Sequence, residues 1–300
     1  MTQNKCCRHG ANLRRRRRRR RKILRSIIFS CSIIAVAVFV AVGSSMIRSG
    51  DGRTNRYDVE AGNNTYDNAV IENSKISEKN KIQNNQSMLD DIMNSTQYPK
   101  QLKDLALKNE EALEFVYDYP AEHVKEHTID LTEEASMDSV PLFVQWDKRW
   151  GYLAYGDDSN VAISGCGPTT LAMAVVALTG NEEATPAAIA KFAMQEGYYM
   201  SGTGTMWSLM TEGAEAYGVR SEQINISQIE IKQHLDQGDI VICSVRQGDF
   251  TTGGHFILLY DYDDEGFSIN DPFSLYRSGQ KWDYGKIRSQ IKAVWALKAK

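Results

Sequence analysis

Residues 164–173 read SGCGPTTLAM, and this stretch predicts a helix that begins at a cysteine. Proline is favoured in the first turn of a helix, and the leucine, alanine and methionine that follow are good helix formers. We expect the helix to end at Gly180, because glycine is common just past a helix C-terminus. Cys166 would then lie between two glycines at the helix N-terminus, where unpaired backbone N–H groups and the helix dipole stabilise a thiolate.

A cysteine nucleophile needs a base, and that base needs a group that orients it. The chain has five histidines, of which three precede the region around the cysteine. His255 is the better of the remaining two, because it follows two glycines and begins an apolar stretch, 256–260, that predicts a strand. His234 lies in a short polar helix and is expected to be a solvated surface residue.

An acidic residue at the end of the next predicted strand, 267–270, is the candidate for orienting the base. Asp271 is followed by Pro272, which cannot continue a strand ladder and so leaves the carboxylate at the strand end. Asn270 is the alternative, and since neighbouring strand residues face opposite sides, only one of the two can serve. We favour Asp271, although an Asp-Pro pair is also a common way to open a turn.

A glutamine upstream of the cysteine is a candidate for the oxyanion hole. Gln145 could donate its side-chain N–H to the oxyanion that forms during acyl transfer. Taken alone, Gln145 would be interpreted instead as a polar residue that ends an edge strand.

The order of the other predicted elements indicates an α+β fold, with helices first and an antiparallel sheet after them. Further helices are expected at 187–195, 206–217 and 227–238, and strands at 240–245, 256–260 and 267–270.

Together these residues resemble the papain-like cysteine peptidases of the bacteriocin-processing (double-glycine) type, in particular the stand-alone relatives that are not fused to a transporter. The resemblance covers roughly residues 140–295. Four elements carry it in chain order: Val140-Pro141 with Gln145, the stretch 164–173, Gly254-His255-Phe256-Ile257 and Ile269-Asn270-Asp271-Pro272. It implies that Gln145 builds the oxyanion hole, Cys166 attacks, His255 is the base and Asp271 orients it, with no cofactor.

One feature departs from the compact members of that family. Residues 147–164 put extra sequence between the glutamine and the cysteine, and four aromatic residues lie in or beside it, Trp146, Trp150, Tyr152 and Tyr155. The segment either lines the substrate cleft or forms a satellite core, and we favour the core.

The N-terminus predicts a membrane anchor. Residues 26–47 are uncharged and apolar, long enough to cross a hydrocarbon layer of ~30 Å and long for a signal peptide, whose apolar core has ~7 to 15 residues. The arginine run Arg14–Arg21 precedes this segment, so the positive-inside rule places residues 1–25 in the cytoplasm. We therefore expect a single-pass protein of the cell membrane that contacts lipid through this helix and exposes its catalytic domain outside the cell.

Two further segments separate the predicted anchor from the catalytic domain at 140–300. Residues 48–98 are polar with few aromatics and predict a disordered linker. Residues 99–139 are expected to form a helical stalk or pro-segment, because apolar residues recur at helical spacing from Leu102 to Tyr117, before Pro120.

Composition excludes several classes of function. The net charge of −3 argues against nucleic-acid binding, and no two histidines or cysteines of the predicted domain have the spacing of metal ligands. Cys243 is the only other cysteine expected outside the cell, so a disulfide with Cys166 is conceivable.

The predicted function is cleavage of peptide bonds through a thioester on Cys166. The same residues would serve an amidase or transpeptidase that acts on cell-wall peptides. A membrane anchor and a long linker would also suit a surface binding module that keeps the fold without catalysis.

Overall fold

The computed structural model describes residues 64–157 and 159–300. The basic tail, 1–25, and the predicted membrane helix, 26–47, lie outside the described residues. Within the described ranges, no helix is both long enough and apolar enough to cross a membrane. Residues 87–300 belong to one compact unit, which contains every candidate site residue.

Helix α2, Asn64–Asn94, occupies much of the region that was expected to be a disordered linker, so that prediction is wrong for these residues. The stretch contains no glycine or proline, and its polar residues tolerate a helix. Its C-terminal end also gains tertiary packing, since Ile92 is fully buried and Met88 and Leu89 pack against the same cluster.

The predicted stalk or pro-segment is a series of short helices: α3 (Lys100–Lys108), the 3-10 helix η1 (Glu110–Ala112), α4 (Leu113–Tyr117), α5 (Tyr119–Glu122) and α6 (Thr132–Ser136). The single helix expected up to residue 117 is interrupted at Asn109, whose backbone is extended. Its side chain accepts a hydrogen bond from the N–H of Glu111 and so starts η1. Pro120 lies within the first turn of α5, a position where its missing N–H costs nothing.

The central helix of the domain is α8, Cys166–Thr179, which is buried at every position after its first residue. It ends at Gly180 in the left-handed conformation (φ 68°), as the sequence predicted. The short helix α7 (Val161–Ser164) precedes it and α9 (Pro186–Gln195) follows, capped by Thr185. The helix predicted at 187–195 is therefore confirmed.

The region after α9 is less regular than expected. Strands β1 (Tyr199–Met200) and β2 (Gly204–Thr205) form a hairpin. The helix predicted at 206–217 is split at Thr211 into a 3-10 helix, η2 (Trp207–Met210), and α10 (Glu212–Ala216). Helix α11 (Gln228–Gln237) agrees with the prediction, with Ser227 as its N-cap and Gly238 at its end.

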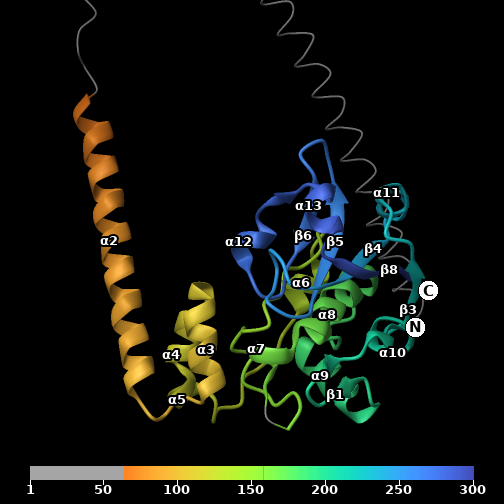
Figure 1. Cartoon of the computed structure of the whole chain (residues 1–300), viewed down its shortest axis with the longest axis horizontal. Coiled ribbons are helices and arrows are strands. Elements are labelled where there is room, and N and C mark those ends of the chain that lie inside the picture. Colours follow the sequence, from red (N-terminus) through yellow and green to blue (C-terminus); the bar gives the residue numbers. More distant parts are fainter. Residues whose placement is uncertain (1–63, 158) are drawn as a thin grey trace, which may run out of the picture. The chain divides into compact units, whose positions relative to one another are not determined.

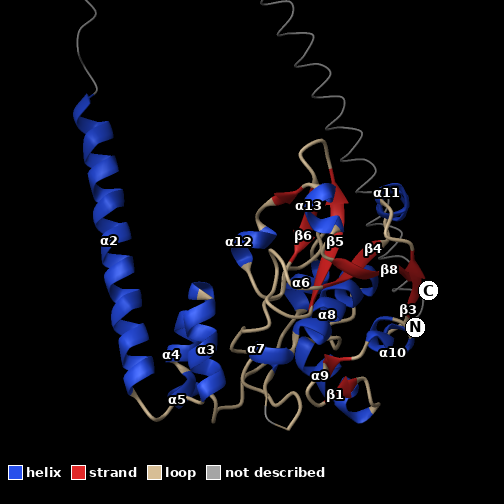
Figure 2. Ribbon diagram, viewed as in Figure 1, coloured by secondary structure: helices blue, strands red, loops and turns tan. Residues whose placement is uncertain are grey.

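A six-stranded antiparallel sheet forms the other layer, in the order β3-β8-β4-β5-β6-β7 (Figures 1 and 2). Its strands are β3 (Val219–Ile224), β4 (Ile240–Val245), β5 (His255–Tyr262), β6 (Phe267–Asn270), β7 (Lys281–Trp282) and β8 (Ile291–Ala299). Two short helices, α12 (Leu275–Ser278) and α13 (Tyr284–Arg288), connect the last strands. The three predicted strands are confirmed, whereas β3, β7 and β8 were not predicted.

Apolar side chains cover both faces of this sheet, which gives the mixed helix and antiparallel-sheet architecture that was expected. Alternate residues of β4, including Ile242, pack with α8 and α9, while Cys243 and its alternates pack with α11 and α13. Cys166 contacts the first of these cores and Cys243 lies in the second. Both thiols are free, and the sheet lies between them, so the conceivable disulfide does not form.

Candidate active site

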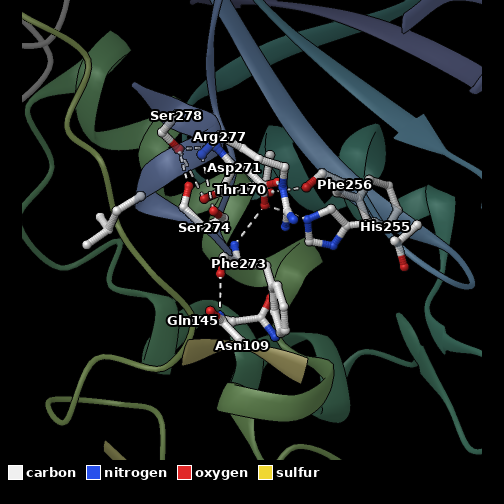
Figure 3. A network of polar contacts seen from close by, with 12 residues as sticks. Asn109, Gln145, Thr170, His255, Phe256, Asp271, Phe273, Ser274, Arg277 and Ser278 are labelled. Carbon is white, nitrogen blue, oxygen red and sulfur yellow. Dashed lines mark hydrogen bonds and ion pairs between the residues drawn. The ribbon is translucent and has the colours of Figure 1, made fainter. Parts of the chain in front are cut away.

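The first residues of β5 and the last residues of β6 lie next to each other at one end of the sheet, because the antiparallel register places Leu258 opposite Asn270. This register brings together two candidate residues from the sequence. His255 Nε2 lies 2.7 Å from the Oδ1 of Asp271, and the two side chains are 6% and 0% exposed (Figure 3). The pair is therefore almost completely removed from water.

The Asp271 carboxylate has two further donors. The backbone N–H of Phe273 donates to Oδ1 over 2.8 Å, and Arg277 Nε donates to Oδ2 over 2.6 Å. Asn270, the alternative orienting residue, instead donates its side-chain amide to the carbonyl of Pro141. The structure thus separates the two neighbours as the strand alternation required.

Each member of the His255–Asp271 pair stabilises the charge of the other. Burial acts to raise the pKa of Asp271, but the charges and hydrogen bonds of His255 and Arg277 outweigh it and lower that pKa. Burial acts to lower the pKa of His255, but Asp271 outweighs it and raises that pKa to about 10. The site therefore favours an ionised carboxylate beside a protonated imidazole.

Cys166 is half-buried at the first position of α8, and its thiol is close enough to His255 to contribute to the raised pKa of that histidine. Since Nε2 of the ring faces Asp271, Nδ1 is the nitrogen left for the thiol. One turn further along α8, Thr170 Oγ1 donates to the carbonyl of Phe256 over 3.3 Å. This bond ties the helix that carries the cysteine to the strand that carries the histidine.

Gln145 is bonded to two segments that adjoin other candidates, helix α7 just before Cys166 and the residue after Asp271. Its backbone N–H donates to Pro272 and its side-chain Nε2 donates to Ala162 of α7, each over 2.7 Å. The acceptor at Ala162 fixes which end of the amide is nitrogen, since an oxygen there would face another oxygen. One N–H of the amide is left for a further acceptor, and the side chain is only 2% exposed.

The site contains two residues that the sequence reasoning did not find. Arg277 is the second cationic partner of Asp271, and the ring of Phe273 lies edge-on to His255 at 6.4 Å between centroids. The Arg277 guanidinium lies 5.8 Å from the centre of the Phe273 ring. Only their closeness to Asp271 in the chain could have indicated either residue.

The aromatic residues between the glutamine and the cysteine belong to the core, the interpretation that was favoured. Trp150 and Tyr155 are fully buried, and Trp146 and Tyr152 pack against the cluster around α3 and α4. His234 is not freely solvated as expected, because it pairs with the buried Asp239 at 3.0 Å and is 15% exposed.

Among residues 64–157 and 159–300, no group of three His, Cys, Asp or Glu side chains is arranged to hold a metal ion. The chemistry that the site offers is that of a thiol beside a polarised imidazole.

A comparison with protein-family models matches residues 137–300, more than half of the chain, to the family described as Peptidase_C39 like family. The matched region includes Gln145, Cys166, His255 and Asp271. No curated protein matches the chain.

Proposed function

Because the chain belongs to the Peptidase_C39-like family of papain-like cysteine peptidase relatives, we propose that it cleaves peptide bonds with Cys166 as nucleophile, His255 as base and Asp271 as orienting group. The observation that carries this proposal is the buried 2.7 Å hydrogen bond between His255 and Asp271 beside the start of α8. A buried imidazole held in this way has one nitrogen fixed and the other directed to the thiol.

The proposed reaction is acyl transfer through a thioester. The Cys166 thiolate attacks the carbonyl carbon of the scissile bond, and His255 gives its Nδ1 proton to the leaving amine as the C–N bond breaks. Water then attacks the thioester while His255 accepts a proton from it, and the carboxylic acid leaves as the C–S bond breaks and the Cys166 thiolate and His255 imidazolium are restored. Asp271 stays ionised throughout and stabilises the imidazolium.

Two groups are placed to stabilise the oxyanion. The backbone N–H of Cys166 lies at the start of α8, where helix N–H groups have no partner within the helix. The second amide N–H of Gln145 is the other proposed donor, and the bonds of Gln145 to Ala162, four residues before Cys166, and to Pro272, next to Asp271, support this role. A preorganised donor of this kind contributes roughly 10²- to 10³-fold to kcat.

The proposed location is the outer face of a cell membrane, with residues 26–47 as the anchor. The apolar length of this segment and the arginine run before it support the proposal. The test is protease treatment of intact cells that express the full chain with a C-terminal tag. Loss of the tag, with the residues before the anchor protected, is expected; a tag that stays protected until the cells are lysed would refute the orientation.

The catalytic assignment is tested by alkylation, which needs no known substrate. The full chain is treated with iodoacetamide between pH 5 and 9, and Cys166 and Cys243 are read separately by mass spectrometry. Cys243 serves as the internal control, because burial raises the pKa of its thiol to about 12. We expect fast modification of Cys166 below pH 7 that becomes slow in His255→Ala.

The matching activity test uses a peptide library. Cys166→Ala and His255→Ala are each expected to abolish cleavage and leave the circular dichroism spectrum unchanged. Retained cleavage in either folded variant would refute the assigned mechanism.

A further inference from the structure

The loop that carries Asp271 is held by a side chain from the segment before the family-matched region. The Glu111 carboxylate of η1 accepts hydrogen bonds from the backbone N–H groups of Leu275 and Tyr276, over 2.6 and 2.8 Å. It also accepts one from Ser274 Oγ over 3.1 Å. Glu111 is therefore bound to three consecutive residues of the loop 271–278.

A second side chain of the same segment holds the residue before these three. Asn109 Nδ2 donates to the carbonyl of Phe273 over 2.8 Å (Figure 3). The Asn109 Oδ1 accepts from the backbone N–H of Glu111. Asn109 is 7% exposed, so this contact is shielded from water. The Asn109 amide therefore binds the loop directly through Phe273, and it also holds the backbone of Glu111, whose carboxylate binds Ser274, Leu275 and Tyr276.

These contacts lead directly to the Asp271 carboxylate. Of its three donors, one is the N–H of Phe273, whose carbonyl Asn109 fixes. Another is Arg277, whose backbone N–H donates to Ser274 Oγ, the same hydroxyl that Glu111 binds. Trp146 Nε1 donates to the same Phe273 carbonyl over 3.1 Å. Residues 109 and 111 therefore contact, together with Trp146, the backbone that presents both of these donors to the carboxylate.

The segment is firmly attached to the domain beside the site. Phe115 stacks on Tyr152 at 4.2 Å between centroids, and its carbonyl accepts from the Tyr152 hydroxyl. A Cβ on Gly151 would approach the Phe115 ring to 2.6 Å, so the glycine allows this close approach. Ala162 of α7, four residues before Cys166, is buried in the same cluster as Leu102 and Leu105 of the segment.

We propose that Asn109 and Glu111 are positioning residues for the active site, which makes the segment 99–139 a lasting part of the working enzyme and not a pro-segment that is removed. Neither side chain touches the reacting atoms; both act through the loop 271–278. The inference rests on the proposed peptidase function and adds to it a requirement for residues outside the matched family region, which begins at residue 137.

The test compares Glu111→Ala, Glu111→Gln and the control Glu114→Ala in the full chain purified in detergent. Glu114 is an exposed acid of the same segment, so the control removes an equal charge. Three quantities are measured: amide hydrogen exchange in residues 273–279, the pKa of His255 by NMR, and kcat and KM on a cleaved library peptide.

Glu111→Ala is expected to speed exchange at Leu275 and Tyr276 at least tenfold, to lower the pKa of His255, and to reduce kcat about tenfold at unchanged KM. That factor corresponds to the loss of roughly one charge-assisted hydrogen bond. Glu111→Gln keeps one acceptor oxygen and is expected to recover part of each effect. Glu114→Ala should match the wild type.

The proposal is overturned if amide hydrogen exchange in Glu111→Ala is as slow as in the wild type. It is also overturned if exchange is faster while the pKa of His255 and kcat are both unchanged. If Glu111→Ala does not fold, Glu111→Gln and Asn109→Ala decide by the same measurements. If the wild type cleaves no peptide, the proposed function fails, whereas the exchange and the His255 pKa still decide whether the two residues position Asp271.

Discussion

Replacement of Asp271 by asparagine should disable this site, although an amide oxygen can accept a hydrogen bond from an imidazole. The reason is the number of donors that face the carboxylate. His255 and the N–H of Phe273 donate to one oxygen, and Arg277 donates to the other. An asparagine has only one oxygen, so its NH2 group must face either the arginine or the histidine.

Both orientations are costly. With the amide oxygen toward His255, the NH2 group faces Arg277 Nε, which is left without an acceptor. With the amide reversed, the NH2 group faces His255 Nε2 and forces the ring to carry its proton on Nδ1, the nitrogen that must accept the thiol proton. The loss of a hydrogen bond to a charged group costs about 1.5–3 kcal/mol, and a buried unsatisfied donor costs about 1–3 kcal/mol. Keeping the amide oxygen toward His255 therefore costs about 2.5–6 kcal/mol, so only about one molecule in 10² to 10⁴ holds the competent orientation and kcat falls by roughly that factor.

The assay is a double-mutant cycle between Asp271→Asn and Arg277→Leu, read as kcat on a library peptide and as the rate of Cys166 alkylation at pH 6. Asp271→Asn alone should lose the full factor. Adding Arg277→Leu removes the competing donor, lets the amide oxygen turn to His255, and should recover at least tenfold. Circular dichroism and the unreactive thiol of Cys243 control for unfolding.

Wild-type activity in Asp271→Asn would show that the charge of Asp271 is unimportant. A double variant no better than Asp271→Asn would show that Arg277 does not determine how the amide is oriented. Either result would refute the account of the site given by its hydrogen bonds.

Three further outcomes are expected. Gln145→Ala should lower kcat by about 10²- to 10³-fold and leave Cys166 alkylation unchanged, because an oxyanion donor acts only after attack; slower alkylation would instead place Gln145 in thiol activation. The His255–Asp271 pair should stabilise the fold most between about pH 4 and 6.5. Its contribution is lost as the pH rises toward the raised His255 pKa of about 10 or falls through the lowered Asp271 pKa. The measurement is the urea midpoint of unfolding across pH, and midpoints that fall as much in Asp271→Asn as in the wild type outside this range would contradict the prediction. Gly180→Ala, at φ 68°, should cost about 1 kcal/mol in thermal unfolding, and no cost would mean that the helix end shifts freely.

The sequence was most informative where local rules and burial agree. The helix from Cys166 to Gly180 has good formers, an early proline and a glycine stop, and each feature acts over a few residues. The three predicted strands are apolar runs, which burial between two layers of helices explains. In adjacent antiparallel strands the start of one lies beside the end of the other. The convergence of His255 and Asp271 could therefore also be expected once the two strands were placed.

Other features depend on partners that sequence distance conceals. Strand β3 begins with one buried residue and then alternates weakly, so only its pairing with β8 defines it. The break at Asn109 follows from its bond to Phe273, which lies 164 residues away. Arg277 lies in α12, a four-residue helix without a buried residue, and its contact with Asp271 exists only because the chain folds back over that carboxylate.

The arrangement around Asp271 explains how one carboxylate can pair with two cations without weakening its hydrogen bond to His255. A guanidinium that shared Oδ1 would compete directly with His255 for the same lone pairs. Here Arg277 uses Oδ2 alone, and the N–H of Phe273 joins His255 on Oδ1, so the plane of the carboxylate is fixed while its charge remains available to the imidazole. What matters is therefore the shape of the loop that presents these donors, and a lysine at position 277 would supply the charge without the fixed direction of the guanidinium Nε. Since Glu111 holds that loop by the backbone N–H groups of Leu275 and Tyr276, the proposed positioning of His255 depends in part on a carboxylate that lies before the matched family region.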